Sequence, residues 1–189
     1  MHPFEKFLEN FTASENSQSI DDSLVQKYEG VFASRVGDGS EVLDLWSKVG
    51  FVPFNDGLFH LLNPELFDSN LKQSFGIAKD AVVFASTALG DCFFWHNKHV
   101  RFLDIQTGKT EIIATNIPMF LNQDIVEKEY YDYKFFGDVQ RQGIQKLGKI
   151  KQGECLILEP VIPLGGERIV ENMSKGERMP YLQILSELS

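Results

Sequence analysis

The sequence has few cysteines and no long apolar run, which argues against a disulfide-rich secreted protein and against a membrane-spanning one. Cys92 and Cys155 are the only cysteines among 189 residues, and they form no CxxC pair. Two distant cysteines are typical of reduced thiols rather than of a disulfide framework. No apolar stretch approaches the roughly 18 residues that a transmembrane helix needs, and the N-terminus lacks the pattern of a secretory signal. We therefore expect a cytoplasmic protein that does not bind membranes.

Basic residues are scarce, especially in the first third of the chain. There are 18 Lys and Arg against 27 Asp and Glu, for a formal charge of −9. Residues 1–70 hold 12 acidic and 4 basic residues, a net charge of −8, which leaves −1 for the rest. Because nucleic-acid binding needs a basic surface that displaces counterions from phosphate, that class is disfavoured. An acidic surface would attract a basic protein, although acidity that only keeps the protein soluble explains the charge equally well.

Common catalytic and phosphate-binding motifs are also missing. The sequence has no GxSxG, GxxxxGK[ST] or GxGxxG segment. Its lone glycine pairs therefore indicate ordinary turns, and we expect Gly90, Gly165 and Gly166 to matter for folding only. We predict no catalytic residue, no cofactor and no small-molecule substrate, and hence a protein that is not an enzyme.

The run His96-Asn97-Lys98-His99 is the one segment that suggests a metal. The two histidines would face each other across a two-residue turn, and Cys92 would share a strand face with His96. An HNH nuclease would need a helix after this hairpin, whereas residues 100–103 alternate like a strand. A polar hairpin tip explains the histidines more simply than a metal does. We predict no metal site, and a small metal-dependent hydrolase is the enzyme alternative.

Helices are predicted first along the chain. Apolar residues recur at helical spacing over residues 4–11, 24–32 and 41–49. Ser40 is placed to cap the third helix and Gly50 to end it. Asn63-Pro64 then indicates a helix start that leads into residues 65–75.

From residue 81 the pattern changes to strands. Residues 81–88, 92–96, 99–105 and 110–114 are apolar or alternating segments with turn residues between them, which predicts an antiparallel meander. The fold class is therefore α+β, with N-terminal helices packed on an antiparallel β-meander and a smaller mixed α/β C-terminal part. That last part is predicted to contain helices over 118–133, 138–147 and 180–188 and strands over 154–160 and 168–171.

Two groups of segments stand out: the first comprises residues 50–59 (GFVPFNDGLF), 88–91, 94–95 and 102–108, and the second comprises 159–166 (EPVIPLGG), 170–172 and 181–185. The first group resembles the GAD-like domain. The second is similar to the C-terminal domain that accompanies it in immunity proteins, which guard bacteria against their own type VI secretion DNase toxins. The resemblance implies a GAD-like domain over residues 1–114, a packed immunity-protein domain over 115–189, and tight binding to a cognate toxin.

Our functional hypothesis is thus an immunity protein whose partner is a toxin, expected to be a basic nuclease. A regulatory interaction module with the same fold and an unrelated partner is the alternative. We expect the acidic third to provide contacts, because Asp38, Glu41, Asp44 and Asp56 lie at or near turns that bound the third helix. Trp95 is a further candidate if it faces outward, although core packing is the more common fate of such a side chain.

Overall fold

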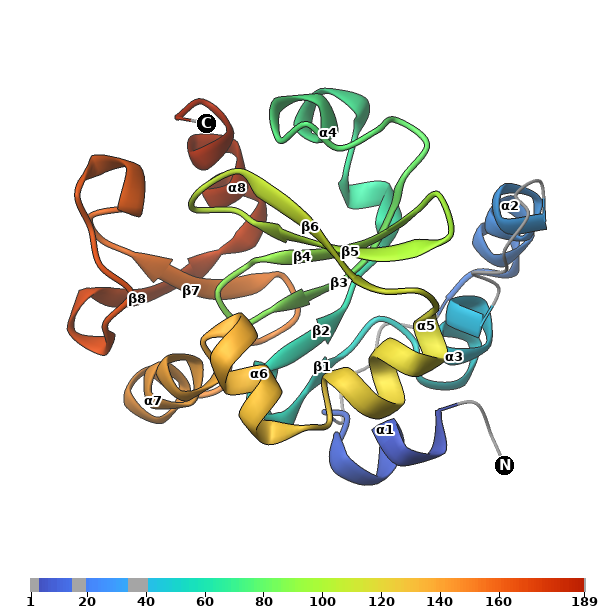
Figure 1. Ribbon diagram of the computed structural model, residues 1–189, viewed down its shortest axis with the longest axis horizontal. Helices are drawn as coiled ribbons and strands as arrows, with labels where there is room; N and C mark the ends of the chain where they lie inside the picture. The colour runs from blue at the N-terminus through green and yellow to red at the C-terminus, as the bar shows by residue number, and fades with distance from the viewer. Residues whose placement is uncertain (1–3, 15–19, 34–40, 189) are drawn as a thin grey trace.

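The computed structural model describes residues 4–14, 20–33 and 41–188 (Figure 1). Within these ranges no helix is long and apolar enough to cross a membrane. The helices described are α1 (Glu5–Asn10), α2 (Asp22–Ala33), α3 (Glu41–Val49), α4 (Ser69–Ser74), α5 (Ile117–Met119), α6 (Lys128–Phe135), α7 (Gly137–Leu147) and α8 (Arg178–Ser186). The strands are β1 (Pro53–Phe54), β2 (Phe59–Leu61), β3 (Val82–Thr87), β4 (Cys92–His96), β5 (His99–Asp104), β6 (Lys109–Ala114), β7 (Glu154–Leu158) and β8 (Met173–Glu177).

The described strands form one antiparallel sheet, in the order β1-β2-β3-β4-β5-β6, and a separate β7-β8 hairpin. The predicted meander corresponds to β3–β6 and is confirmed, as is the α+β class. Its tightest turn behaves as the sequence indicates, because His96 pairs with His99 and the two turn residues between them have φ values of 50° and 65°. Positive φ at both central residues matches the twist of a two-residue hairpin.

Helices cover both faces of the sheet at its centre, so β3 and β4 are buried on both sides, whereas the edge strand β6 is largely exposed. In strand β4, Phe93 and Trp95 point into a core shared with α1, α2, α3, α5 and α6. The alternate residues Cys92 and Phe94 point into a second core formed with α4, β7 and α8. Successive strand residues face opposite sides, and for that reason β4 is buried along almost its whole length.

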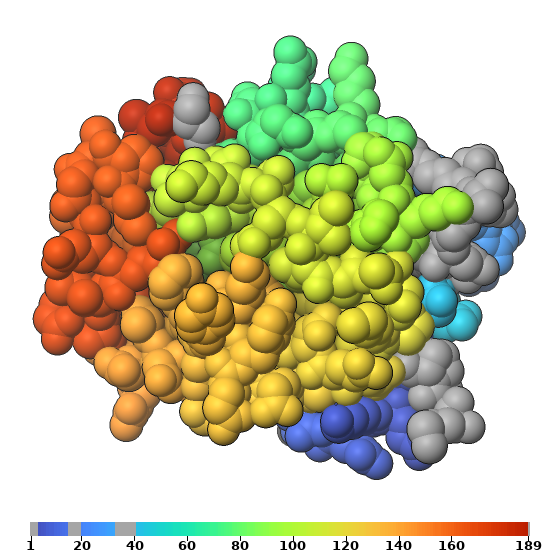
Figure 2. All heavy atoms as spheres, viewed as in Figure 1, coloured from blue at the N-terminus to red at the C-terminus, as the bar shows by residue number. Residues whose placement is uncertain are grey.

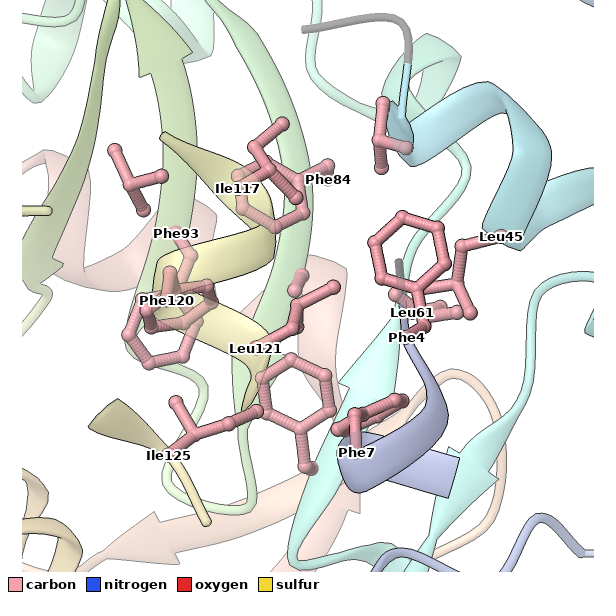
Figure 3. Close-up of a cluster of buried hydrophobic side chains, with 14 of the residues drawn as sticks. Phe4, Phe7, Leu45, Leu61, Phe84, Phe93, Ile117, Phe120, Leu121 and Ile125 are labelled. Carbon is pink, nitrogen blue, oxygen red and sulfur yellow. The ribbon is translucent and has the colours of Figure 1, made fainter. Parts of the chain in front are cut away.

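Aromatic packing holds the first core together (Figure 3). Phe93 lies at its centre, with ring centroids 4.8 Å from Phe120 and 5.1 Å from Phe135. Phe7 of α1 packs on Phe54 of β1 at 5.0 Å. Each buried aromatic contributes about 1.5–3 kcal/mol through removal of its surface from water. Because this core joins the N-terminal helix to residues beyond 115, the two predicted domains share it, while their boundary itself stays a prediction.

The C-terminal part packs against one end of the sheet. A third core joins Ala88 and Leu89, after β3, to Leu156 and Met173 of the β7-β8 hairpin. Figure 2 shows the C-terminal segments, coloured orange to red, forming one side of the molecule.

Three predicted elements differ in detail from the structure. The helix predicted over 118–133 is interrupted: a π-helical turn η3 (Phe120–Asp124) follows α5, and α6 begins only at Lys128. Ile125 N–H donates to the Phe120 carbonyl oxygen at 3.1 Å, five residues back. This wider turn lets Phe120, Leu121 and Ile125 all reach the first core.

The helix predicted over 65–75 is split because Asp68 begins a new one. Its side chain accepts a hydrogen bond from Leu71 N–H at 2.8 Å, so α4 is separate from the 3-10 turn η2 (Pro64–Leu66). The strand predicted over 168–171 is wrong. A 3-10 turn η5 (Val170–Asn172) occupies that position, and the strand that pairs with β7 is β8.

Candidate protein-binding surface

A strained turn between β1 and β2 presents one of the predicted acidic residues. Asn55, Asp56 and Gly57 form a 3-10 turn η1, and their φ values are 49°, 58° and 96°. Non-glycine residues seldom adopt positive φ, and such strain tends to gather at functional sites. The surroundings must therefore hold this turn firmly.

Two segments that are far apart along the chain clamp the turn. On one side, the Asn55 side chain accepts from Thr12 N–H at 2.9 Å and donates to the Asn10 carbonyl oxygen at 3.1 Å. On the other, Ile150 N–H donates to the Asp56 carbonyl oxygen at 2.9 Å. A Cβ at Gly57 would lie 2.4 Å from the Ile150 oxygen, so the close approach requires glycine there. The clamp fixes the position of Asp56.

The carboxylate of Asp56 is exposed but not isolated. Its Oδ1 lies 2.9 Å from Lys149 Nζ, and the two side chains are 55% and 79% exposed. Clefts of about 800 Å³ and about 570 Å³ flank the residue, the second of them lined by Lys128 and Arg141. Asp56 therefore has basic neighbours, which weaken the electrostatic attraction between its carboxylate and a distant positively charged group.

Three predicted acids lie within α3 or just before it in the sequence, and the structure describes two of them. Asp44 is exposed, and within the described part of the chain no basic group lies within ion-pair distance of it. Glu41 is half-buried at the start of the helix. Asp38 and the predicted cap Ser40 lie outside the described residues. Of the predicted acidic contacts, Asp44 and Asp56 are thus available on the surface.

Trp95 does not face outward, so that expectation is wrong. It is 2% exposed and belongs to the first core, whereas its neighbour Phe94 is buried in the second. The alternative of core packing is confirmed for both, because helices cover each face of the sheet.

The hairpin histidines lie together, but no third metal ligand joins them. His96 Nε2 is 3.3 Å from Asp80 Oδ1, and His99 Nδ1 is 2.7 Å from the Asn97 carbonyl oxygen. Cys92 lies in the second core, where burial raises the pKa of its thiol. The described residues contain no group of three or more His, Cys, Asp or Glu that could hold a metal ion.

A buried polar network, which the sequence analysis missed, ties the C-terminal part to the sheet. Asp91 Oδ1 accepts from Ile105 N–H at 3.0 Å. Gln106 Nε2 donates to the Tyr181 hydroxyl oxygen at 2.7 Å, and Leu158 N–H donates to the same oxygen at 3.0 Å. The turns after β3 and β5, which carry Asp91 and Gln106, are evident in the sequence. Their contact with α8 is not, because it joins residues that are far apart along the chain.

Two more buried polar side chains belong to this junction. His60 Nε2 lies 2.9 Å from the Gly57 carbonyl oxygen, and burial with the nearby Arg178 charge holds its pKa well below the usual value. Arg178 donates to the Glu154 carbonyl oxygen at 2.7 Å. Both side chains are at most 1% exposed. These contacts explain structural roles for both groups, since buried polar groups need partners.

Comparison with known proteins gives one family and one fold. The model of the GAD-like domain matches residues 2–109, whereas no curated protein matches the sequence. The crystal structure of Atu4351 from Agrobacterium tumefaciens is similar, with a TM-score of 0.79 and 19% sequence identity, over 98% of this chain and 89% of that one. At this identity the likeness shows the fold alone. Because the family model covers more than half of the sequence, the chain belongs to the GAD-like domain family.

Proposed function

We propose that the chain is an immunity protein that binds a cognate bacterial toxin in the cytoplasm and neutralises it without being an enzyme. The observation that carries the proposal is the clamped turn at residues 55–57. The backbone of this turn is strained, and hydrogen bonds from two distant segments hold it in place. The turn presents the carboxylate of Asp56 to solvent. The Asp56–Lys149 ion pair is exposed, so this carboxylate is accessible to a basic group of a partner at short range, while attraction over longer distances falls to acids such as Asp44.

The charge balance supports a nuclease as the target. A DNase must present a basic surface to hold DNA. An inhibitor with a net charge of −8 in its first 70 residues offers a competing polyanionic surface. Asp44, exposed on α3, adds a charge that no described basic side chain offsets within ion-pair distance. Membership in the GAD-like domain family supports the same role, because the sequence resembles immunity proteins in which this domain is followed by a second one.

Growth protection tests the proposal. The gene immediately upstream of this one would be expressed in a bacterial host with and without this chain. We expect the upstream product alone to stop growth and degrade DNA, and co-expression to restore growth through a complex that survives purification. Growth arrest that persists despite equal amounts of folded chain would contradict neutralisation. A harmless upstream product that still forms a complex would favour the regulatory module instead.

A further inference from the structure

Helix α8 is apolar on two faces, although only one of them packs against the protein. Its buried side carries Tyr181, Leu182 and Leu185. On its outer side Ile184 is 56% exposed, and Leu188, two residues beyond the end of the helix, is 39% exposed. Pro180 and Ile184 lie one turn apart on the helix, and Leu188 follows at the same spacing, so the three extend one apolar stripe. A surface helix normally has a polar outer face.

The stripe forms one wall of a groove. The groove has a volume of about 450 Å³, and Pro160, Val161 and Leu164 line its opposite side. Leu164 is 66% exposed, which makes it one of the most exposed apolar side chains described. Exposed apolar residues that gather around one concavity, rather than being scattered singly, indicate a binding site.

The Leu-Gly-Gly segment holds the Leu164 wall in place. Leu164 ends a 3-10 turn η4 (Ile162–Leu164), and the next residue, Gly165, has a φ of 88°. Gly166 then packs so closely that a Cβ there would overlap the Pro160 carbonyl oxygen. The segment that carries part of the family resemblance thus shapes the groove.

The base of the groove is preorganised. The Tyr181 hydroxyl is turned inward, where Gln106 Nε2 and Leu158 N–H both donate to its oxygen. The ring also lines the groove. Because the side chain is fixed from behind, little conformational entropy would be lost when a ligand binds.

The charges around the groove have one sign. Glu159 and Glu177 line it and are exposed, and neither forms an ion pair with any described residue. No Lys, Arg or His is among the lining residues. A ligand that inserts an apolar side chain and carries Lys or Arg beside it would complement both features.

We propose that this groove binds an apolar segment of the toxin that is flanked by Lys or Arg. The inference rests on the proposed function and adds a contact to it. In Figure 1 α8 lies on the side opposite α2 and α3, so the groove is separate from the Asp44 surface. The groove supplies the apolar anchor that Trp95, being buried, does not.

Binding to the purified, catalytically inactivated upstream product tests the groove. The variants are Ile184→Glu and Leu164→Glu, with Tyr133→Glu as the control, because Tyr133 is 85% exposed on α6 and does not line the groove. We expect each groove variant to raise Kd at least about tenfold, mostly through faster dissociation, and the control to bind like the wild type. If a glutamate variant does not fold, Ile184→Ser and Leu164→Ser replace it.

The double variant Glu159→Lys/Glu177→Lys should also weaken binding and flatten its salt dependence. Unchanged affinity in both groove variants, with a wild type that binds, overturns the groove and leaves the proposed function intact. A wild type that does not bind overturns both. A wild type that is dimeric, with a monomeric Ile184→Glu variant, would show that a second copy of this chain occupies the groove and overturns the assignment to the toxin.

Discussion

The guanidinium of Arg168 donates a hydrogen bond to Asp104 Oδ1 at 2.5 Å and thereby joins the C-terminal part to the end of β5. Both side chains are largely buried, at 13% and 17% exposure. Arg168 also lies 4.3 Å above the Phe136 ring, so two separate contacts hold it. The charges of Arg168 and Asp104 both act on the pKa of the nearby Asp91 carboxyl group.

We predict that Asp91 makes stability depend on pH. Burial raises its pKa to about 7, the Asp104 charge adds to the rise, and Arg168 opposes it. Between about pH 4 and 7 the folded state therefore binds more protons than the unfolded state, and stability falls as pH rises through this window. In Asp91→Asn that loss is absent. Its unfolding free energy, relative to wild type, should rise by about 4 kcal/mol from pH 4 to pH 7 and stay level above it.

Urea unfolding of both proteins at several pH values between 4 and 8.5 measures this difference. Asp104→Asn is a second test, because it removes one cause of the raised Asp91 pKa and should make the fall in stability with pH shallower, besides destabilising the protein through loss of the Arg168 partner. Parallel stability curves for wild type and Asp91→Asn would show that Asp91 titrates normally. The comparison subtracts the opposite effect of His60, which stays neutral when buried and favours unfolding as pH falls below its usual pKa.

We predict that Trp95 acts in stability and not in binding. Trp95→Ala should lower the unfolding free energy by about 3–5 kcal/mol, because it leaves a cavity in the first core. Calorimetry gives the change in Tm, and titration at a temperature where the variant is folded gives its affinity for the toxin. A variant with native Tm and weakened binding would return Trp95 to the interface.

We predict different outcomes for two adjacent glycines. Gly165 has positive φ and open space around it, so Gly165→Asn strains only the backbone and should cost about 1 kcal/mol. Gly166→Ala should cost about 2 kcal/mol or more, because the new methyl group would overlap the Pro160 carbonyl. Gly30→Ala, in the interior of α2 with nothing within 4 Å, is the control and should stabilise by about 0.5–1 kcal/mol. Equal melting temperatures for the Gly166→Ala and Gly165→Asn proteins would refute the steric account.

We predict that Asp44 contributes more than Asp56 does to association with the proposed toxin partner. Asp44→Asn should slow association about two- to threefold at low salt and flatten its salt dependence, with little change in dissociation. Asp56→Asn should have a smaller effect, because Lys149 already offsets that charge. Stopped-flow measurements at two ionic strengths decide the order. Identical rates for both variants and wild type would place the docking face elsewhere.

Local patterns in the sequence were enough for the elements that depend on neighbouring residues. The β3–β6 meander follows from alternation and turn residues, and the turn between His96 and His99 needs only two residues with positive φ. The end of α3 at Gly50 is equally local, since Gly50 N–H donates to the Trp46 carbonyl oxygen and its φ is 73°. For such features the nearest residues set the backbone conformation.

Long-range packing decided the rest. Strand alternation shows only that Trp95 and Phe94 face opposite sides of the sheet. It does not show that both sides are buried, because the second face is covered by α4 and by α8 from the end of the chain. The charge of Asp56 is evident in the sequence, but its ion pair with Lys149 joins residues far apart along the chain. The groove beside α8 is likewise hidden, because an outward Ile184 and an inward Leu185 are both simply apolar until the sheet defines which side is covered. Sequence therefore determined most of the elements and the net charge, whereas the tertiary structure decided which side chains reach solvent, because burial depends on contacts between segments that are distant in sequence.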